Sequence, residues 1–142
     1  MRRIGNERAG NQLLNLPVKG ATELIEGTMA VLGADGYAVP ASKATGLIAA
    51  GRVEGYCDNL LGGDGDATVT VKRGTFVWAN DGTIEATDLL KPCYIKDATT
   101  VTLTADGASL AGIILEVAED GVTVDMTQGV INITTTTPGV GG

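Results

Sequence analysis

Acidic side chains and glycines gather in one short stretch of the sequence, GGDGD at residues 62–66. An EF-hand calcium loop needs acidic ligands at alternate positions and a glutamate at its end. With Asp64 as position 1, the ligand positions 5 and 12 are occupied by Thr68 and Thr75, so the EF-hand pattern fails. The β-roll calcium repeat fails because Asp66 comes one place early, and no Gly-Lys-Ser/Thr phosphate signature follows. We therefore predict a flexible connection between two strands, in which the aspartates stay soluble and outside the sheet.

Side chains for nucleophilic catalysis are few in this chain. It has no histidine, which excludes Ser-His and Cys-His pairs and any Cys₂His₂ zinc site. The two serines, Ser42 and Ser109, lie outside any G-x-S-x-G motif. The two cysteines, Cys57 and Cys93, are expected to be buried free thiols, with a single disulfide as the alternative. The sequence predicts a protein without enzyme activity, catalytic residues, cofactor or metal.

Charge is unevenly distributed along the chain. Residues 1–20 carry four basic side chains against one acidic, whereas the remaining 122 residues carry six basic against sixteen acidic. An acidic body does not suit nucleic-acid binding, because phosphates need a basic face. No apolar run is long enough for a membrane span, and no secretory signal follows the first basic residues. We expect no nucleic-acid or membrane partner, and synthesis in a cytoplasm. The basic start is either a docking arm for an acidic surface or a solvated terminus.

The elements that would position any site are short strands. Glycine occurs 21 times, and Asp-Gly pairs stand at residues 35–36, 64–65, 81–82, 106–107 and 120–121. Asp-Gly between apolar runs predicts hairpins with type I′ turns, in which both central residues have positive φ. The clearest hairpin is predicted at residues 111–126. One face would hold Ala111, Ile113, Leu115 and Val117, followed after the turn by Val122, Val124 and Met126.

A second hairpin is predicted at residues 67–80. Val69 and Val71 alternate with polar residues, and Phe76 and Trp78 share one face of the return strand. Lys-Arg-Gly at 72–74 would form the turn, with the glycine left-handed. Further strands are expected at residues 22–32, 37–40, 46–57, 92–96 and 99–104, with one short helical turn at 87–90.

This spacing predicts an all-β fold, a small sandwich or barrel of about eight to ten short strands. We expect an extended N-terminal arm at residues 1–17, a β domain at 18–131 and a polar C-terminal tail at 132–142. The arm carries an apolar patch around Leu13 and Leu14.

The central part of the chain resembles the capsid decoration proteins of tailed bacteriophages, also called cement or head-stabilising proteins. The likeness spans residues 46–126 and rests on GRVEGYCDN (51–59), GGDG (62–65), VTVKRGTFVW (69–78), LLKPCY (89–94) and AGII (111–114). These are turn and strand signatures, and no catalytic residues come with the family.

The resemblance implies a non-enzymatic virion protein on the outer surface of an assembled head. It would clamp subunits of the major capsid protein and would associate with itself as a homodimer or homotrimer. An extended arm could add a strand to an exposed sheet edge, or could instead pack on its own barrel. The expected capsid-contacting residues are Arg2, Arg3, Ile4, Arg8, Leu13 and Leu14.

An alternative function is that of a β-type binding module, such as a virion adhesin for carbohydrate. Sugar sites use stacked aromatic rings, and the aromatic side chains of this chain are Tyr37, Tyr56, Phe76, Trp78 and Tyr94.

Overall fold

The structure, a computed structural model, describes residues 13–127, and its regular secondary structure is almost entirely β-strand. This confirms the predicted all-β fold. Its only helical segment in that range is the 3-10 turn η1 (Ala86–Asp88), close to the expected helical turn. The strands number twelve, more than the eight to ten expected from the sequence: β1 (Leu13–Pro17), β2 (Thr22–Leu24), β3 (Met29–Leu32), β4 (Ala38–Pro40), β5 (Ile48–Val53), β6 (Cys57–Asn59), β7 (Thr68–Lys72), β8 (Thr75–Asn80), β9 (Pro92–Ile95), β10 (Thr100–Thr102), β11 (Leu110–Ala118) and β12 (Gly121–Asp125).

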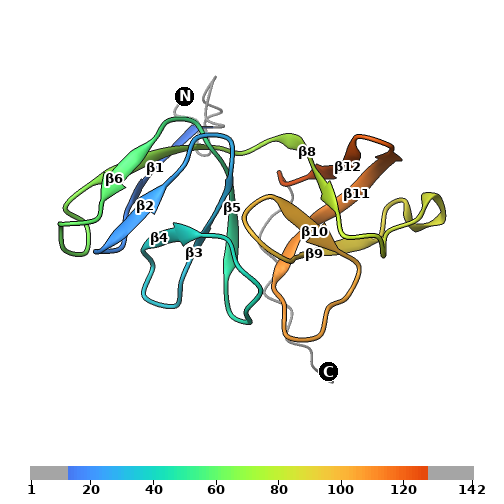
Figure 1. Cartoon of the computed structure of the whole chain (residues 1–142), viewed down its shortest axis with the longest axis horizontal. Helices are drawn as coiled ribbons and strands as arrows, with labels where there is room; N and C mark the ends of the chain where they lie inside the picture. Colours follow the sequence, from blue (N-terminus) through green and yellow to red (C-terminus); the bar gives the residue numbers. More distant parts are fainter. Residues whose placement is uncertain (1–12, 128–142) are drawn as a thin grey trace, which may run out of the picture.

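Two halves lie side by side along the long axis (Figure 1). The first, here called the sheet half, holds β1 to β7. Five of its strands form an antiparallel sheet in the order β1-β7-β5-β3-β4, and β2 pairs with β6 as a separate ribbon. A single parallel bridge between Val18 and Ala38 draws the two ends of the sheet together. The sheet therefore curls without closing along β1.

The second half, here called the barrel half, is a closed barrel in the order β10-β8-β12-β11-β9. Closure comes from β10, which pairs with β8 in parallel and with β9 antiparallel. Phe76 and Trp78 share one face of β8, as predicted. Both are buried, and their rings meet edge to face with centroids 6.1 Å apart. A closed barrel leaves no strand edge exposed.

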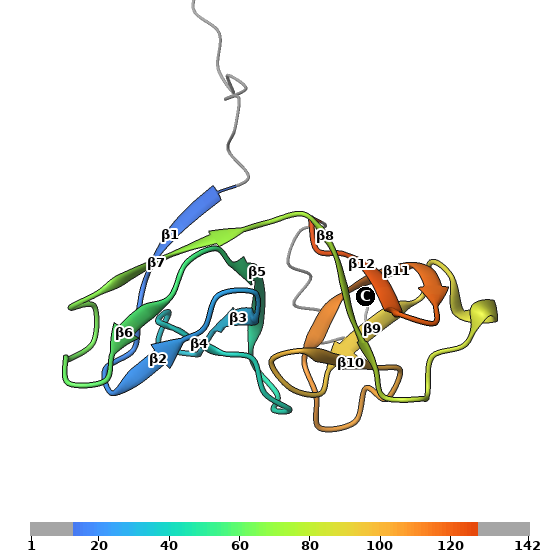
Figure 2. The ribbon, with the colours of Figure 1, turned by 45° about the horizontal axis from the view of Figure 1, so that its top comes forward.

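The predicted hairpin at residues 67–80 is wrong. β7 pairs with β1 and β5, whereas β8 pairs with β10 and β12, so the chain passes from one half to the other between Lys72 and Thr75. Gly74 is not among the residues with positive φ in the described part of the chain. The Lys-Arg-Gly sequence is a crossing point rather than a turn (Figure 2).

One hydrophobic core joins the halves. Met29 and Val31 of β3 pack with barrel residues such as Ile114 in a single buried cluster. Ser109 ties the halves further, because its buried hydroxyl donates to Ala44 O and accepts from Leu47 N–H. A buried hydroxyl needs hydrogen-bond partners, and here they come from the other half. The shared core and these bonds make the two halves one body.

The hairpin at residues 111–126 is confirmed, but its predicted inward face is only partly right. β11 contains two irregularities in register, between Leu110 and Gly112 and between Ile114 and Glu116. Each bulge shifts the alternation by one residue. Ile114 is therefore buried, while Leu115, which we expected inside, is exposed.

The predicted type I′ turns are also corrected. In four of the five Asp-Gly pairs the glycine has φ between 71° and 100°, at Gly36, Gly65, Gly82 and Gly107. The aspartates do not have positive φ, so these turns need a left-handed residue only at the glycine. In the hairpin between β11 and β12, the turn residues are Glu119 and Asp120, with Gly121 already in the strand.

Candidate interaction surfaces

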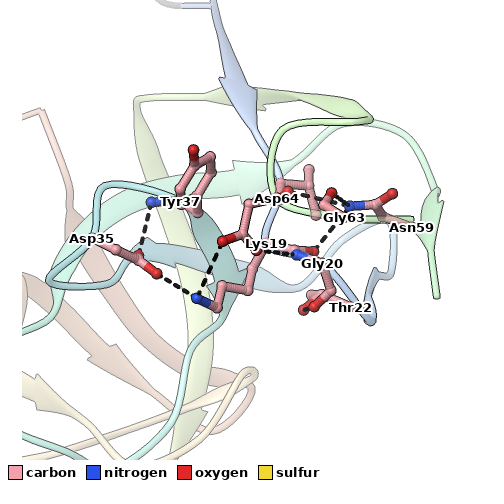
Figure 3. Close-up of polar contacts among 9 residues, drawn as sticks. Lys19, Gly20, Thr22, Asp35, Tyr37, Asn59, Gly63 and Asp64 are labelled. Atoms are coloured by element: carbon pink, nitrogen blue, oxygen red, sulfur yellow. Dashed lines mark hydrogen bonds and ion pairs between the residues drawn. The ribbon is translucent and has the colours of Figure 1, made fainter. Parts of the chain in front are cut away.

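The glycine- and aspartate-rich loop is fixed by its own hydrogen bonds. Asp64 Oδ1 accepts from Gly20 N–H at 2.9 Å (Figure 3). Asp66 Oδ2 accepts from Gly63 N–H at 2.8 Å. Asn59 Nδ2, at the end of β6, lies 3.0–3.2 Å from the carbonyls of residues 18, 19 and 63. The loop is a strand connection, as predicted, but it is held in place rather than flexible. Within residues 13–127, no three Asp, Glu, Cys or His side chains gather as metal ligands would.

One glycine of the loop is explained by the close approach of its backbone to the side chain of Asn59. A Cβ built on Gly62 would lie 2.1 Å from Asn59 Oδ1, closer than any side chain tolerates. The glycine therefore lets the loop close over the buried Asn59 side chain.

An exposed ion pair lies beside this loop, and its lysine also approaches Asp64. Lys19 Nζ donates to Asp35 Oδ2 at 2.5 Å and lies 3.6 Å from Asp64 Oδ2. The hydrogen bond to Asp35 raises the pKa of Lys19, and the same bond lowers the pKa of Asp35. All three side chains are more than a third exposed, so solvent screens the pair and it contributes little to stability. The arrangement closes a loop and offers no group for proton transfer.

The two cysteines are free and buried, as predicted. Cys57 lies in the β2-β6 ribbon and Cys93 in the barrel. Burial raises the pKa of both thiols, that of Cys93 to about 12. Neither is suited to act as a nucleophile, because the thiolate is the reactive form.

The predicted capsid-contacting residues fall in two groups. Arg2, Arg3, Ile4 and Arg8 lie outside the described residues. Leu13 and Leu14 belong to β1, which pairs with β7 along its whole length. The arm that the sequence places at residues 1–17 therefore contributes its last five residues to the sheet. Proline at position 17 marked the end of the strand rather than the end of an arm.

One side of β1 has an open edge. Val18 N–H donates to Ala67 O on the β7 side, so by alternation Leu14 and Leu16 also direct their backbone groups to β7. Leu13, Asn15 and Pro17 direct theirs away from β7, and beyond Pro17 this side meets Ala38 of β4, so the open part of the edge is at Leu13 and Asn15. Within residues 13–127, β1 has no strand partner other than β7. Proline fits an edge because it lacks an N–H.

The side chains along this edge carry no charge. Leu13 is 53% exposed, while Leu14 and Leu16 are half-buried against the sheet. Natural proteins usually protect a free edge with lysine or other charged residues. β1 runs from Leu13 to Pro17 without any. It is thus the described surface best suited to bind an extended segment of another chain.

The aromatic residues offer little surface for sugar stacking. Phe76 and Trp78 are buried in the barrel, so they cannot form a platform. Tyr56 is exposed, and its hydroxyl donates to Glu23 Oε2 at 2.5 Å, which raises the pKa of Tyr56 to about 12. This arrangement does not favour the alternative of a carbohydrate-binding module.

Sequence reasoning missed a second exposed apolar surface, at the turn after η1. Leu89 and Leu90 were expected to form part of a helical turn, yet they are 49% and 73% exposed. Two adjacent leucines in an otherwise polar connection were the available signal.

Comparison with known proteins adds no assignment. No family model matches the chain, and no curated protein or solved structure matches it either. None of the helices in the part of the chain that the structure describes could cross a membrane.

Proposed function

We propose that this chain is a structural virion protein that binds the outer surface of an assembled phage head. It would hold subunits of the major capsid protein together by adhesion alone. The proposal is supported by the resemblance of residues 46–126 to capsid decoration proteins. The observation that carries it is the open, uncharged edge of β1, a strand that directly follows the basic residues 1–12.

The edge gives a concrete mode of attachment. An extended segment of a shell subunit adds as a sixth strand beside β1 and bonds to the outward backbone groups of Leu13 and Asn15. Leu13 contributes apolar contact on one face. Arg2, Arg3, Ile4 and Arg8 extend the contact beyond the sheet, with the arginines on acidic groups of the shell.

Repetition gives such contacts their effect. Ordering a chain segment costs entropy, so a single attachment of this type is weak. A shell presents many equivalent sites, and copies that associate as a homodimer or homotrimer bind several of them at once. No chemistry is needed for this function, and no nucleic acid or membrane takes part.

A backbone substitution at the edge tests the proposal. Asn15→Pro removes the outward N–H without removing a bond to β7, because Asn15 directs its backbone away from β7. The matched control is Asn15→Ala, which keeps the N–H and loses only the side-chain bond from Thr70 Oγ1. We expect Asn15→Ala to co-sediment with undecorated heads like the natural chain, and Asn15→Pro to bind about tenfold more weakly.

Heads provide the second test. Decorated heads should survive heat and osmotic shock that break undecorated ones. The proposal fails if purified virions lack this chain, or if heads with and without it are equally resistant.

A further inference from the structure

The exposed leucines after η1 lie in a strained turn. Lys91 N–H donates to Asp88 O at 3.1 Å, Leu89 has φ −60° and ψ 140°, and Leu90 has φ 68°. These values define a type II turn with Leu90 at the left-handed position, which glycine normally occupies. An L-residue other than glycine pays about 1–2 kcal/mol there.

A bulge fixes Leu90 in that conformation. Leu90 N–H donates to Ile114 O at 2.7 Å, and Ile114 N–H donates to Lys91 O at 3.0 Å. Two residues thus oppose one, with the first left-handed, which is the geometry of a bulge that usually begins with glycine. The strain buries nothing, because Leu90 is 73% exposed. The bulge requires a left-handed backbone at this position but does not require a leucine there, so the exposed side chain points to a role outside the fold.

A third leucine completes an apolar tip on the barrel half. Leu115 is 41% exposed and directly follows Ile114, the residue of β11 that bonds to both Leu90 and Lys91. We call Leu89, Leu90 and Leu115 the leucine tip. Both views show η1 and the β11-β12 hairpin at the same end of the molecule, away from β1 (Figures 1 and 2).

The surroundings of the leucine tip are acidic. Glu85, Glu116, Glu119 and Asp120 are all exposed on η1 and the hairpin. The nearby cation, Lys91, is paired with Asp88 at 3.0 Å. A ligand for this end should therefore combine apolar and basic side chains.

We propose that the leucine tip binds residues 1–12 of a second copy of this chain. That segment carries Arg2, Arg3 and Arg8 against one acid, with Ile4 among them. Isoleucine packs on the leucines while the arginines meet the carboxylates. Twelve extended residues span at most about 40 Å. Because β1 and the leucine tip lie in opposite halves, the arm of a neighbour fits the tip in a head-to-tail contact.

The contact goes beyond the proposed function and does not rest on it. It joins copies to one another in the absence of a shell. On a shell, residues 1–12 of each copy bind either the capsid surface or the leucine tip of the next copy, so binding to heads competes with the contact between copies. The experiment therefore uses the purified full-length chain without heads.

Sedimentation equilibrium of three variants tests the contact. We expect the natural chain to self-associate with increasing concentration, and more weakly at high salt. Leu90→Gly removes the apolar contact. A second variant with Arg2→Glu, Arg3→Glu and Arg8→Glu together reverses the charge of residues 1–12. Each variant should raise the dissociation constant about tenfold or more. Leu61→Gly, which changes a fully exposed leucine of the sheet half, is the matched control and should have no effect.

Mixing the two defective variants provides a sharper test. A head-to-tail contact needs one arm and one tip, so the Leu90→Gly chain still donates an arm to the tip of the charge-reversed chain. Their mixture should form a heterodimer although each alone is mainly monomeric. A mixture that stays monomeric would overturn the proposal.

Folding is monitored in the same samples. Leu90→Gly relieves backbone strain, so its melting temperature should rise by about 2–4 °C while association weakens. A lower melting temperature would show that Leu90 serves the fold. A natural chain that remains monomeric at its highest soluble concentration would also overturn the second-copy contact.

Discussion

The two halves of this molecule use similar strands in opposite ways. In the barrel half every strand has two neighbours, and its core contains large side chains such as Trp78 and Ile114. The sheet half has a core of smaller residues, mainly valine and alanine, and its five-stranded sheet ends at two edge strands, β1 and β4, which meet only at the bridge between Val18 and Ala38. A closed barrel is stable but offers no backbone to a partner. We therefore propose that attachment uses the open half, whereas the barrel can contribute only side chains from its turns.

The largest expected effect lies in the barrel core. Ile114→Ala should lower the free energy of unfolding by about 3 kcal/mol, because Ile114 is fully buried and its removal leaves a cavity. Leu115→Ala is the neighbouring control, with an expected change of about 0.5 kcal/mol or less. Urea denaturation followed by Trp78 fluorescence measures both. Equal losses at the two positions would contradict the bulge that turns Leu115 outward.

Removal of β1 should have the next largest effect. Deleting residues 1–16 uncovers Val69 and Val71, which pair with Leu16 and Leu14, so unfolding should become easier by about 2 kcal/mol. Deleting only residues 1–12 should leave the free energy of unfolding within about 0.5 kcal/mol of the natural value. Two deletions with the same stability would mean that β1 is not part of the sheet.

The stability of the loop at residues 62–66 should depend on the side-chain amide of Asn59. Asn59→Ala removes the donor for carbonyls of residues 18, 19 and 63 and should cost about 2 kcal/mol. Asp58→Ala, which loses only an exposed bond to Leu60 N–H, should cost about 0.5 kcal/mol. Thermal melts of the two variants compare them, and the reverse order would refute the role of Asn59.

The smallest effect concerns the rates at which a thiol reagent modifies the two cysteines, and it involves no change in stability. Cys93 in the barrel is fully buried, whereas Cys57 in the ribbon is 6% exposed. A thiol reagent should therefore modify Cys57 first in the folded protein, and both at equal rates in denaturant. Faster labelling of Cys93 would show that the barrel opens more readily than the sheet.

The sequence predicted the all-β class and most strand positions because alternation and turn residues are local properties. It did not predict strand pairing. The run from Thr68 to Asn80 satisfies the local pattern of a hairpin, yet its two strands join different sheets, since pairing depends on neighbours distant in sequence. The inward face of β11 was partly wrong for a related reason. A bulge costs little locally and is decided by how the barrel closes.

The candidate surfaces could be predicted only in part. Leu13 and Leu14 stand out as apolar residues beside a basic segment, and the structure places both on the edge strand. That their strand pairs with β7 through Val71 and Lys72 could not be read from a short segment that ends at a proline. The leucine tip escaped prediction because its turn lacks the glycine that normally marks a left-handed residue.

A density map of decorated heads gives the most direct test of attachment through the open half. The account predicts continuous density for an added strand alongside β1, contributed by a capsid subunit, with the leucine tip turned away from that strand. A map in which β1 faces solvent, and the barrel half makes the contact with the shell, would contradict it.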